Sequence, residues 1–152
     1  MLDFTNFLCF RINALSRRIS RLYNNRCLEY GITASQSFVI FDVMNHEGTS
    51  VRNIAERIQL DSPAITGLID RLVKEKLIER KEDPQDRRSL KIYLTPKGRE
   101  LAETKLVPMA NEFNEYIKNT VDPNIVNIFK YSLDLMDMHL KKASVKSSTP
   151  VP

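Results

Sequence analysis

The chain has 152 residues, of which 42% are hydrophobic, and a formal net charge of +4. This length suits one domain or a compact two-lobe unit with an ample core. The sequence has no apolar run of about 18 residues, so no membrane span is expected, and its first residues lack the basic segment of a secretory signal. The cysteines and histidines lack the spacing of a zinc site, so we expect neither a metal nor a cofactor, and a reducing cytoplasm is the simplest location.

The first expected helix covers most of residues 1–30, ends at Tyr30-Gly31 and carries a heptad-like apolar seam. The seam consists of Leu8, Ile12, Leu15, Ile19 and Leu22. Five arginines and no acidic residue occur from Arg11 to Arg26. For these arginines, a solvated helical face and a functional role are about equally supported.

Two further helices are predicted before the middle of the chain. One begins at Thr33, which can form a capping box with Gln36, and runs to about His46, with Gly48 just beyond it. The next is short and is capped by Ser50. Its apolar face repeats at helical spacing through Val51, Ile54, Ala55 and Ile58.

A fourth helix follows after only three residues, 59–61. Asp61 or Ser62 can cap it, and Pro63 suits its first turn. Its apolar stripe consists of Ile65, Leu68, Ile69, Leu72 and Val73. Its other face contains no glutamate and begins with short side chains. It consists of Ser62, Ala64, Thr66, Gly67, Asp70 and Lys74. Short side chains near a helix start let backbone and hydroxyls approach base edges in the major groove. The alternative is an ordinary helical hairpin packed in a core.

A charged loop between two short apolar segments then predicts a β-hairpin with strands near residues 77–81 and 90–94. Asp83-Pro84 opens the turn, because proline keeps the preceding residue out of the helical region. Seven basic residues stand against three acidic ones over residues 80–99, which indicates the electrostatic footprint that phosphates need. Most charged hairpin loops bind nothing, so the preceding helix pair is what favours a DNA-binding wing.

The end of the chain predicts two long helices and a tail. One helix begins at Thr95-Pro96, with a kink expected at Pro108, and the other begins at Asp122-Pro123. The inward face of the last helix is expected at Ile125, Phe129, Leu133, Met136 and Leu140. Residues 143–152 are expected to be disordered. The helices at both ends of the chain are too apolar for a small winged domain to bury alone, so a second copy is expected to cover them.

Helix, turn, helix and hairpin is the order of a winged helix-turn-helix. The chain resembles the multiple antibiotic resistance regulator (MarR) family over roughly residues 5–142, most specifically from Asp86 to Gly98. Residues 72–80 also match, with Lys76 where the family often has glycine. The resemblance implies a mainly α fold with a small β-hairpin wing (α+β), in which a winged helix-turn-helix lobe joins a lobe of terminal helices. The DNA-binding domain is then expected at 31–95, and the dimerisation region at 1–30 and 96–142.

The resemblance also implies roles for single residues. Arg88 would enter the minor groove, and Asp86 would orient it. The expected DNA contacts are Ser62, Ala64, Thr66, Lys74, Asp86, Arg87 and Arg88. One recognition helix reads few base pairs, so a homodimer on a palindromic double-stranded operator is expected.

A thiol trigger is one hypothesis for release from DNA. The surroundings of Cys9 resemble the start of the family's peroxide sensors, in which tyrosines hold a first-helix cysteine. Tyr23 matches one of those positions, but Asn13 and Ala34 stand where the others would be tyrosines. Cys9 and Cys27 are 18 residues apart, about 27 Å along one helix, so they cannot pair within one chain.

A small ligand is the other hypothesis, and the one that we favour. An aromatic wall with a guanidinium would suit an aromatic acid. The candidate pocket residues are Phe10, Asn13, Arg17, Phe38 and Phe41, for each of which ordinary packing or surface exposure is the alternative.

Three classes of function remain. The favoured one is a MarR-type transcriptional regulator, a repressor that a small aromatic or acidic ligand releases from DNA. The alternatives are a peroxide-sensing repressor that acts through Cys9 and a winged-helix module for protein contacts, whose wing would be neutral. An enzyme is not expected, because no nucleophile, phosphate-loop or paired-carboxylate motif stands out.

Overall fold

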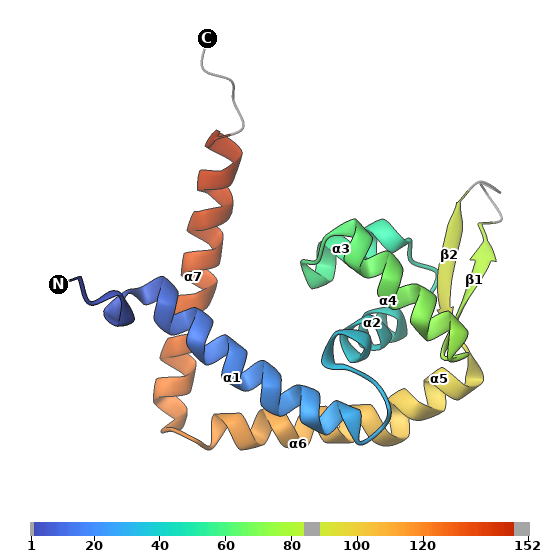
Figure 1. Ribbon diagram of the computed structural model, residues 1–152, viewed down its shortest axis with the longest axis horizontal. Helices are drawn as coiled ribbons and strands as arrows, with labels where there is room; N and C mark the ends of the chain where they lie inside the picture. The colour runs from blue at the N-terminus through green and yellow to red at the C-terminus, as the bar shows by residue number, and fades with distance from the viewer. Residues whose placement is uncertain (1, 84–88, 148–152) are drawn as a thin grey trace, which may run out of the picture. The chain divides into compact units, whose positions relative to one another are not determined.

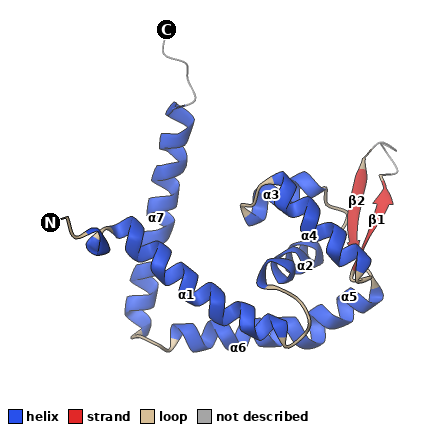
Figure 2. Ribbon diagram, viewed as in Figure 1, coloured by secondary structure: helices blue, strands red, loops and turns tan. Residues whose placement is uncertain are grey.

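The computed structural model describes residues 2–83 and 89–147, without the side chains of Ser62 and residues 143–147. The helices are α1 (Leu8–Leu28), α2 (Ala34–Asn45), α3 (Val51–Ile58), α4 (Ser62–Lys74), α5 (Pro96–Leu101), α6 (Val107–Lys118) and α7 (Pro123–Ser147) (Figure 1). A 3₁₀ turn, η1 (Phe4–Asn6), precedes α1, and a π-helical segment, η2 (Ala102–Leu106), joins α5 to α6. The strands β1 (Ile78–Glu82) and β2 (Leu90–Leu94) form a hairpin (Figure 2). The predicted mainly helical fold with a small β-hairpin is confirmed.

The chain divides into two compact units, Met1–Ala110 and Asn111–Pro152. The first unit contains the whole winged helix-turn-helix together with α1, α5 and η2. The functional boundaries expected at 1–30, 31–95 and 96–142 stay predictions.

Helix α2 is the centre of the first unit. It contacts α1, α3, α4, β2 and η2. Its start is the predicted capping box between Thr33 and Gln36, and His46 caps its C-terminal end, two residues before Gly48 with a φ of 74°. The core around it is completely buried at Val39, Ile40, Val43, Ile54, Ile65, Ile69, Leu72, Ile92 and Leu106. Burial of these branched side chains is the main force that holds the helices together.

The hairpin is antiparallel, and its register pairs Ile78 with Leu94 and Arg80 with Ile92. Ile92 and Leu94 are buried as their alternation predicts, but Leu90 is 46% exposed. Leu90 pairs with Glu82 at the outer end of the hairpin. A strand face is buried only where another layer covers it.

The base of the hairpin needs a glycine on the next helix. A Cβ atom at Gly98 would lie 1.8 Å from the carbonyl oxygen of Leu77, which no side chain can tolerate. Thr95 caps α5, because its hydroxyl accepts a hydrogen bond from the Gly98 N–H at 3.0 Å. Close approach of backbone to backbone therefore fixes α5 at the start of β1.

Pro108, where we expected a kink, lies in the first turn of α6 directly after η2. Proline has no N–H and its ring clashes with the carbonyl four residues earlier. Wider π-helical turns relieve such a conflict locally. The irregularity therefore takes the form of a π segment one turn before the proline.

The second unit contains most of α6 and all of α7. Helix α7 continues through residues 143–147, which we expected to belong to a disordered tail, and residues 148–152 lie outside the described part. Most of its apolar residues are exposed in the single chain, with exposed fractions of 56% at Ile125, 65% at Ile128 and 45% at Phe129. Of the face expected to point inward, only Met136 is half-buried, and the other four residues are exposed.

Within residues 2–83 and 89–147, the structure contains neither a membrane-spanning helix nor a metal-binding cluster. None of the helices there is long and apolar enough to cross a membrane. The same residues contain no group of three or more His, Cys, Asp or Glu side chains that could hold a metal ion.

Candidate nucleic-acid interface

Helix α4 presents one face to solvent because the first unit buries the other. The Asp61 carboxylate accepts a hydrogen bond from the Ala64 N–H at 2.8 Å and so caps the helix. The chain enters this cap after Gln59, whose φ of 56° is left-handed, which is uncommon for a residue other than glycine. Complete burial of one stripe fixes the helix rotation, at Ile65, Ile69 and Leu72.

The exposed face of α4 carries small residues first and cations afterwards. Its exposed members are Pro63, Ala64, Thr66, Gly67, Asp70, Arg71 and Lys74. Among the described residues, Arg71 and Lys74 have no ion-pair partner. Two such cations on one open face suit the phosphates of a nucleic acid. Ser62 begins the helix, but its side chain lies outside the description.

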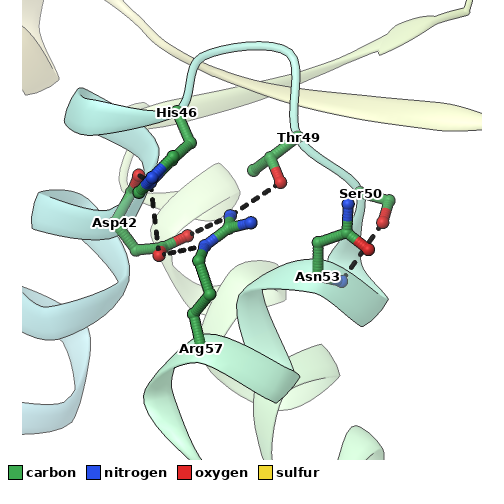
Figure 3. A network of polar contacts seen from close by, with 6 residues as sticks. All are labelled: Asp42, His46, Thr49, Ser50, Asn53 and Arg57. Carbon is green, nitrogen blue, oxygen red and sulfur yellow. Dashed lines mark hydrogen bonds and ion pairs between the residues drawn. The ribbon is translucent and has the colours of Figure 1, made fainter.

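Helix α3 is tied to α2 by a network around Asp42 (Figure 3). Arg57 Nε and Nη2 donate to the two carboxylate oxygens of Asp42 at 2.6 and 2.7 Å, and Nη2 also donates to Thr49 Oγ1 at 2.7 Å. His46 Nδ1 lies 3.0 Å from the Asp42 carbonyl oxygen. The hydrogen bond with Asp42 raises the pKa of the Arg57 guanidinium. Since Asp42 is buried, this bidentate pair fixes α3, on which the placement of α4 depends.

Most of the described cations along residues 80–99 are already paired. Arg80 binds Asp70 of α4, and Lys81 Nζ lies 2.8 Å from Glu79 and 5.0 Å from the centre of the Tyr93 ring. The hydrogen bond with Glu79 raises the pKa of Lys81. Two further pairs are Lys91 with Asp83 at 3.3 Å and Arg99 with Glu47 at 2.6 Å.

This pairing corrects the expectation of a basic stripe along residues 80–99. Of its five basic residues that the structure describes, four face carboxylates, and four of those acids, Glu47, Asp70, Glu79 and Glu103, lie outside that stretch of sequence. A count of charges along the chain misses acids that the fold brings in. The positive field around the hairpin strands is therefore weaker than the composition indicates.

The tip of the hairpin lies outside the described residues. Asp86, Arg87 and Arg88 belong to this tip and are not described, so their proposed contacts stay predictions. On the described side of the tip, the Asp83 N–H donates to the Ser89 carbonyl oxygen at 2.9 Å.

Tyr23, a candidate partner of Cys9, is engaged at the other end of α1. Its hydroxyl lies 3.2 Å from Ser37 Oγ, and the Cys27 thiol lies 3.7 Å from the same oxygen. Burial raises the pKa of both Tyr23 and Cys27. Cys9 is exposed and is 14 residues away from Tyr23, about 21 Å along the helix. The structure therefore does not bring Cys9 and Tyr23 together within one chain.

The candidate effector residues also lie in separate places within one chain. Phe38 is exposed and stacks on Tyr23 at 5.4 Å, whereas Phe10 packs edge-on against Phe4 at 5.2 Å. Phe10 and Tyr23 are 13 residues apart on α1, about 20 Å, so Phe10 and Phe38 do not share a wall in one chain. The others are exposed or half-buried: Asn13 donates to the Cys9 carbonyl at 2.9 Å, Arg17 is exposed and Phe41 is half-buried.

A cavity of about 350 Å³ lies elsewhere in the first unit. Its lining residues are Tyr30, Gly31, Ile32, Glu75, Leu77, Lys97 and Leu101. It contains none of the candidate effector residues, and Lys97 Nζ already donates to the Glu75 carbonyl at 3.0 Å. The cavity therefore adds no support to the expected pocket.

Sequence reasoning did not select three groups that the structure makes prominent. Arg71 follows the pattern of the exposed α4 face and could have been chosen with Lys74. Gly67 was placed on that face but given no role. The Arg57–Asp42 pair joins residues 15 positions apart and has no local signal.

Comparison with known proteins agrees with this geometry. The model of the MarR family matches residues 32–90. The HTH-type transcriptional regulator SarZ of Staphylococcus aureus (strain USA300) is 32% identical over 136 residues, covering 86% of this chain and 91% of SarZ. The SarZ of Staphylococcus epidermidis (strain ATCC 12228 / FDA PCI 1200) is 30% identical over 109 residues, covering 72% of this chain and 74% of that protein.

Solved structures share the fold. Bordetella bronchiseptica BpsR, described with regulation of its DNA binding by 6-hydroxynicotinic acid, superposes with a TM-score of 0.82 at 24% identity over 90% of this chain and 97% of its own. A mutant of Escherichia coli MarR complexed with operator DNA gives 0.81 at 21% identity, with coverage of 90% and 99%. With the winged helix-turn-helix, the family match and these relatives together, the chain belongs to the MarR family of DNA-binding transcriptional regulators.

Proposed function

We propose that this protein is a cytoplasmic homodimeric repressor that binds a palindromic DNA duplex and releases it when a small aromatic or acidic molecule binds. The observation that carries the proposal is the exposed face of α4. Small residues in its first half leave room for base edges, and Arg71 and Lys74 follow as cations without an ion-pair partner among the described residues. The family consists of transcription regulators rather than enzymes.

The division of labour between helix and wing follows from which cations are paired. On the hairpin strands, Arg80, Lys81 and Lys91 interact with carboxylates, so their attraction for phosphate is reduced. Lys74 is exposed and supplies a phosphate contact on α4. Arg88 at the wing tip would add the minor-groove contact, with Asp86 and Arg87 beside it.

Dimerisation is supported by the apolar surface that the single chain leaves open. The seam of α1 is exposed at Leu8, Leu15 and Leu22, and α7 is exposed at Ile125 and Ile128. A second copy would bury both surfaces. A two-fold dimer would then present two α4 helices to half-sites centred about 10 base pairs apart.

A second copy would also complete the effector site. Phe10 and Phe38 are separated within one chain, so a pocket with both needs the α1 of the partner. The reported regulation of BpsR by 6-hydroxynicotinic acid supports an aromatic acid as the class of ligand. Such a ligand would favour one spacing of the two recognition helices, with a coupling of about 1–3 kcal/mol.

A peroxide trigger through Cys9 is less well supported. Tyr23 is buried and its hydroxyl interacts with Ser37, and the Asn13 amide donates to a backbone carbonyl rather than to the thiol. A thiol without cationic or hydroxyl partners is a poor nucleophile. Comparison of wild type with Cys9→Ser in a DNA titration, with and without hydroperoxide, tests this alternative.

The direct test selects a duplex from a randomised pool with the wild-type protein and measures affinity against salt concentration. We expect palindromic selected sequences and a dimer in sedimentation at micromolar concentration. Lys74→Ala should lower the slope of log affinity against log salt by about one per protomer. Lys81→Ala, the matched control, should change it less, because Glu79 already neutralises that ammonium group.

Two outcomes would count against the proposal. A monomer that binds a single half-site tightly would rule out the proposed dimer and its palindromic site. Equal salt slopes for the Lys74→Ala and Lys81→Ala variants would rule out α4 as the phosphate-binding element.

A further inference from the structure

The chain has four glycines, and the fold itself explains three of them. Gly31 and Gly48 both have a φ of 74°, which favours glycine. At Gly98, a Cβ atom would collide with the Leu77 backbone at 1.8 Å. Each of these positions would be strained with any other residue.

At position 67, in contrast, neither backbone conformation nor packing requires a glycine. Gly67 lies inside α4, its φ is not positive, and a Cβ atom placed there would meet nothing within 4 Å. Glycine weakens an exposed helix interior relative to alanine, because it loses more backbone entropy on folding. The chain therefore keeps a destabilising residue where its own packing would accept a side chain.

The position of Gly67 on the helix indicates what lies outside it. Residues four and seven positions later share its side of a helix, and these are Arg71 and Lys74. Both are exposed, and neither forms an ion pair within the described part of the chain. A polyanion that lies along this side of the helix, over both cations and the small residues that precede Gly67, passes directly over Gly67.

We propose that Gly67 is a positioning residue that lets the backbone of α4 approach the DNA duplex closely. The inference rests on the proposed function, since the duplex is the polyanion. Without a side chain at 67, the small residues before it and the cations after it can contact the same groove together. A methyl group at this point would hold the helix away from the base edges, while looser contacts to phosphates would survive.

The test measures stability and DNA affinity in the same variants. Gly67→Ala and Gly67→Leu introduce good helix formers of increasing size. Both should raise the melting temperature by about 2–4 °C. Affinity for the duplex selected by the wild-type protein should fall about tenfold for alanine and further for leucine. Binding to a random duplex of equal length should change much less.

A matched control separates helix stability from contact with DNA. Asn45 is exposed in the last turn of α2, belongs neither to the expected DNA contacts nor to the expected dimerisation region, and Asn45→Ala also improves helix propensity. It should raise the melting temperature without a loss of affinity. An equal loss in this variant would show that a stiffer protein binds worse, and would overturn the role of Gly67.

The remaining outcomes separate the two proposals. Wild type that selects a duplex, together with Gly67 variants that bind it equally well, overturns the inference and leaves the proposed function standing. Wild type that selects no duplex overturns both. Affinity that falls with side-chain size while stability rises supports close approach at Gly67.

Discussion

Helix α4 and helix α7 both carry continuous apolar faces, but they differ in what covers those faces. In α4, Ile65, Ile69 and Leu72 are completely buried by the first unit. In α7, Ile125 and Ile128 remain 56% and 65% exposed. An apolar face of this size in water is unfavourable, at about 25 cal/mol per Å². The same pattern therefore forms a core in α4 and an exposed surface in α7, where we propose that a second copy binds.

The largest expected effect comes from one substitution made in both regions. Ile69→Ala removes a fully buried side chain and should lower the free energy of unfolding by about 2–5 kcal/mol. Ile128→Ala should cost less than about 1 kcal/mol in the monomer, but its cost should grow at concentrations where the dimer forms. Denaturant unfolding at several protein concentrations measures both. A cost at Ile128 that is large and independent of concentration would mean that α7 is covered within its own chain.

An intermediate effect is expected for the polar network of the first unit. Arg57→Ala leaves the buried Asp42 carboxylate without its bidentate partner and should destabilise the protein by about 2–3 kcal/mol. Arg52 lies on the same helix, but its pair with Glu56 is exposed, at 84% and 62% for the two side chains. Arg52→Ala should therefore cost less than about 0.5 kcal/mol. Similar losses for both variants in urea unfolding would contradict a structural role for the Asp42 network.

The smallest effect concerns the two cysteines of α1, of which one is exposed and the other is buried. Cys9 is exposed and should react with a thiol reagent in the folded protein, whereas Cys27 is buried and should react only after unfolding. Native protein should therefore label at one thiol per chain and denatured protein at two. Rapid labelling of both thiols would show that α1 and α2 separate readily.

The pH dependence of stability follows from the same burial, which raises the pKa of Cys27 above its ordinary value of 9.0. A raised pKa means that the folded state keeps the neutral thiol after the unfolded chain has begun to lose its proton. Its contribution to stability is complete below pH 9.0 and is lost as the pH rises through the folded-state pKa. Cys27→Ser removes this ionisation, so wild type should lose more stability than the variant between neutral and alkaline pH. Urea unfolding at both pH values measures the difference.

Local features of the sequence predicted the fold well. The capping box of Thr33 and Gln36, the cap at Ser50 and the apolar stripe of α4 all depend on residues a few positions apart. Their geometry follows from the helical repeat and from backbone groups that need partners at helix ends. Leu90 was misjudged, because alternation in a strand shows which side a residue faces but not whether anything lies there.

The candidate interface was only partly predictable. Exposed positions on α4 followed from its stripe, so Ala64, Thr66 and Lys74 were found where an exposed face requires them. The paired state of Arg80, Lys81 and Arg99 did not follow, nor did the engagement of Tyr23 with Ser37. Most of these partners lie between 10 and 52 positions away in the sequence.

The sequence by itself determined where the helices and the hairpin lie and which face of each is apolar, because those properties arise between near neighbours. The tertiary structure alone decided which cations remain available to phosphate and which apolar faces stay exposed. It also decided at which position, Gly67, the fold does not require a glycine. Charge pairing and burial depend on distances between residues remote in the chain, and these exist only after the elements have packed. Arg80 and Lys74 show the difference: both are basic residues close to the hairpin, but only Arg80 meets a carboxylate among the described residues.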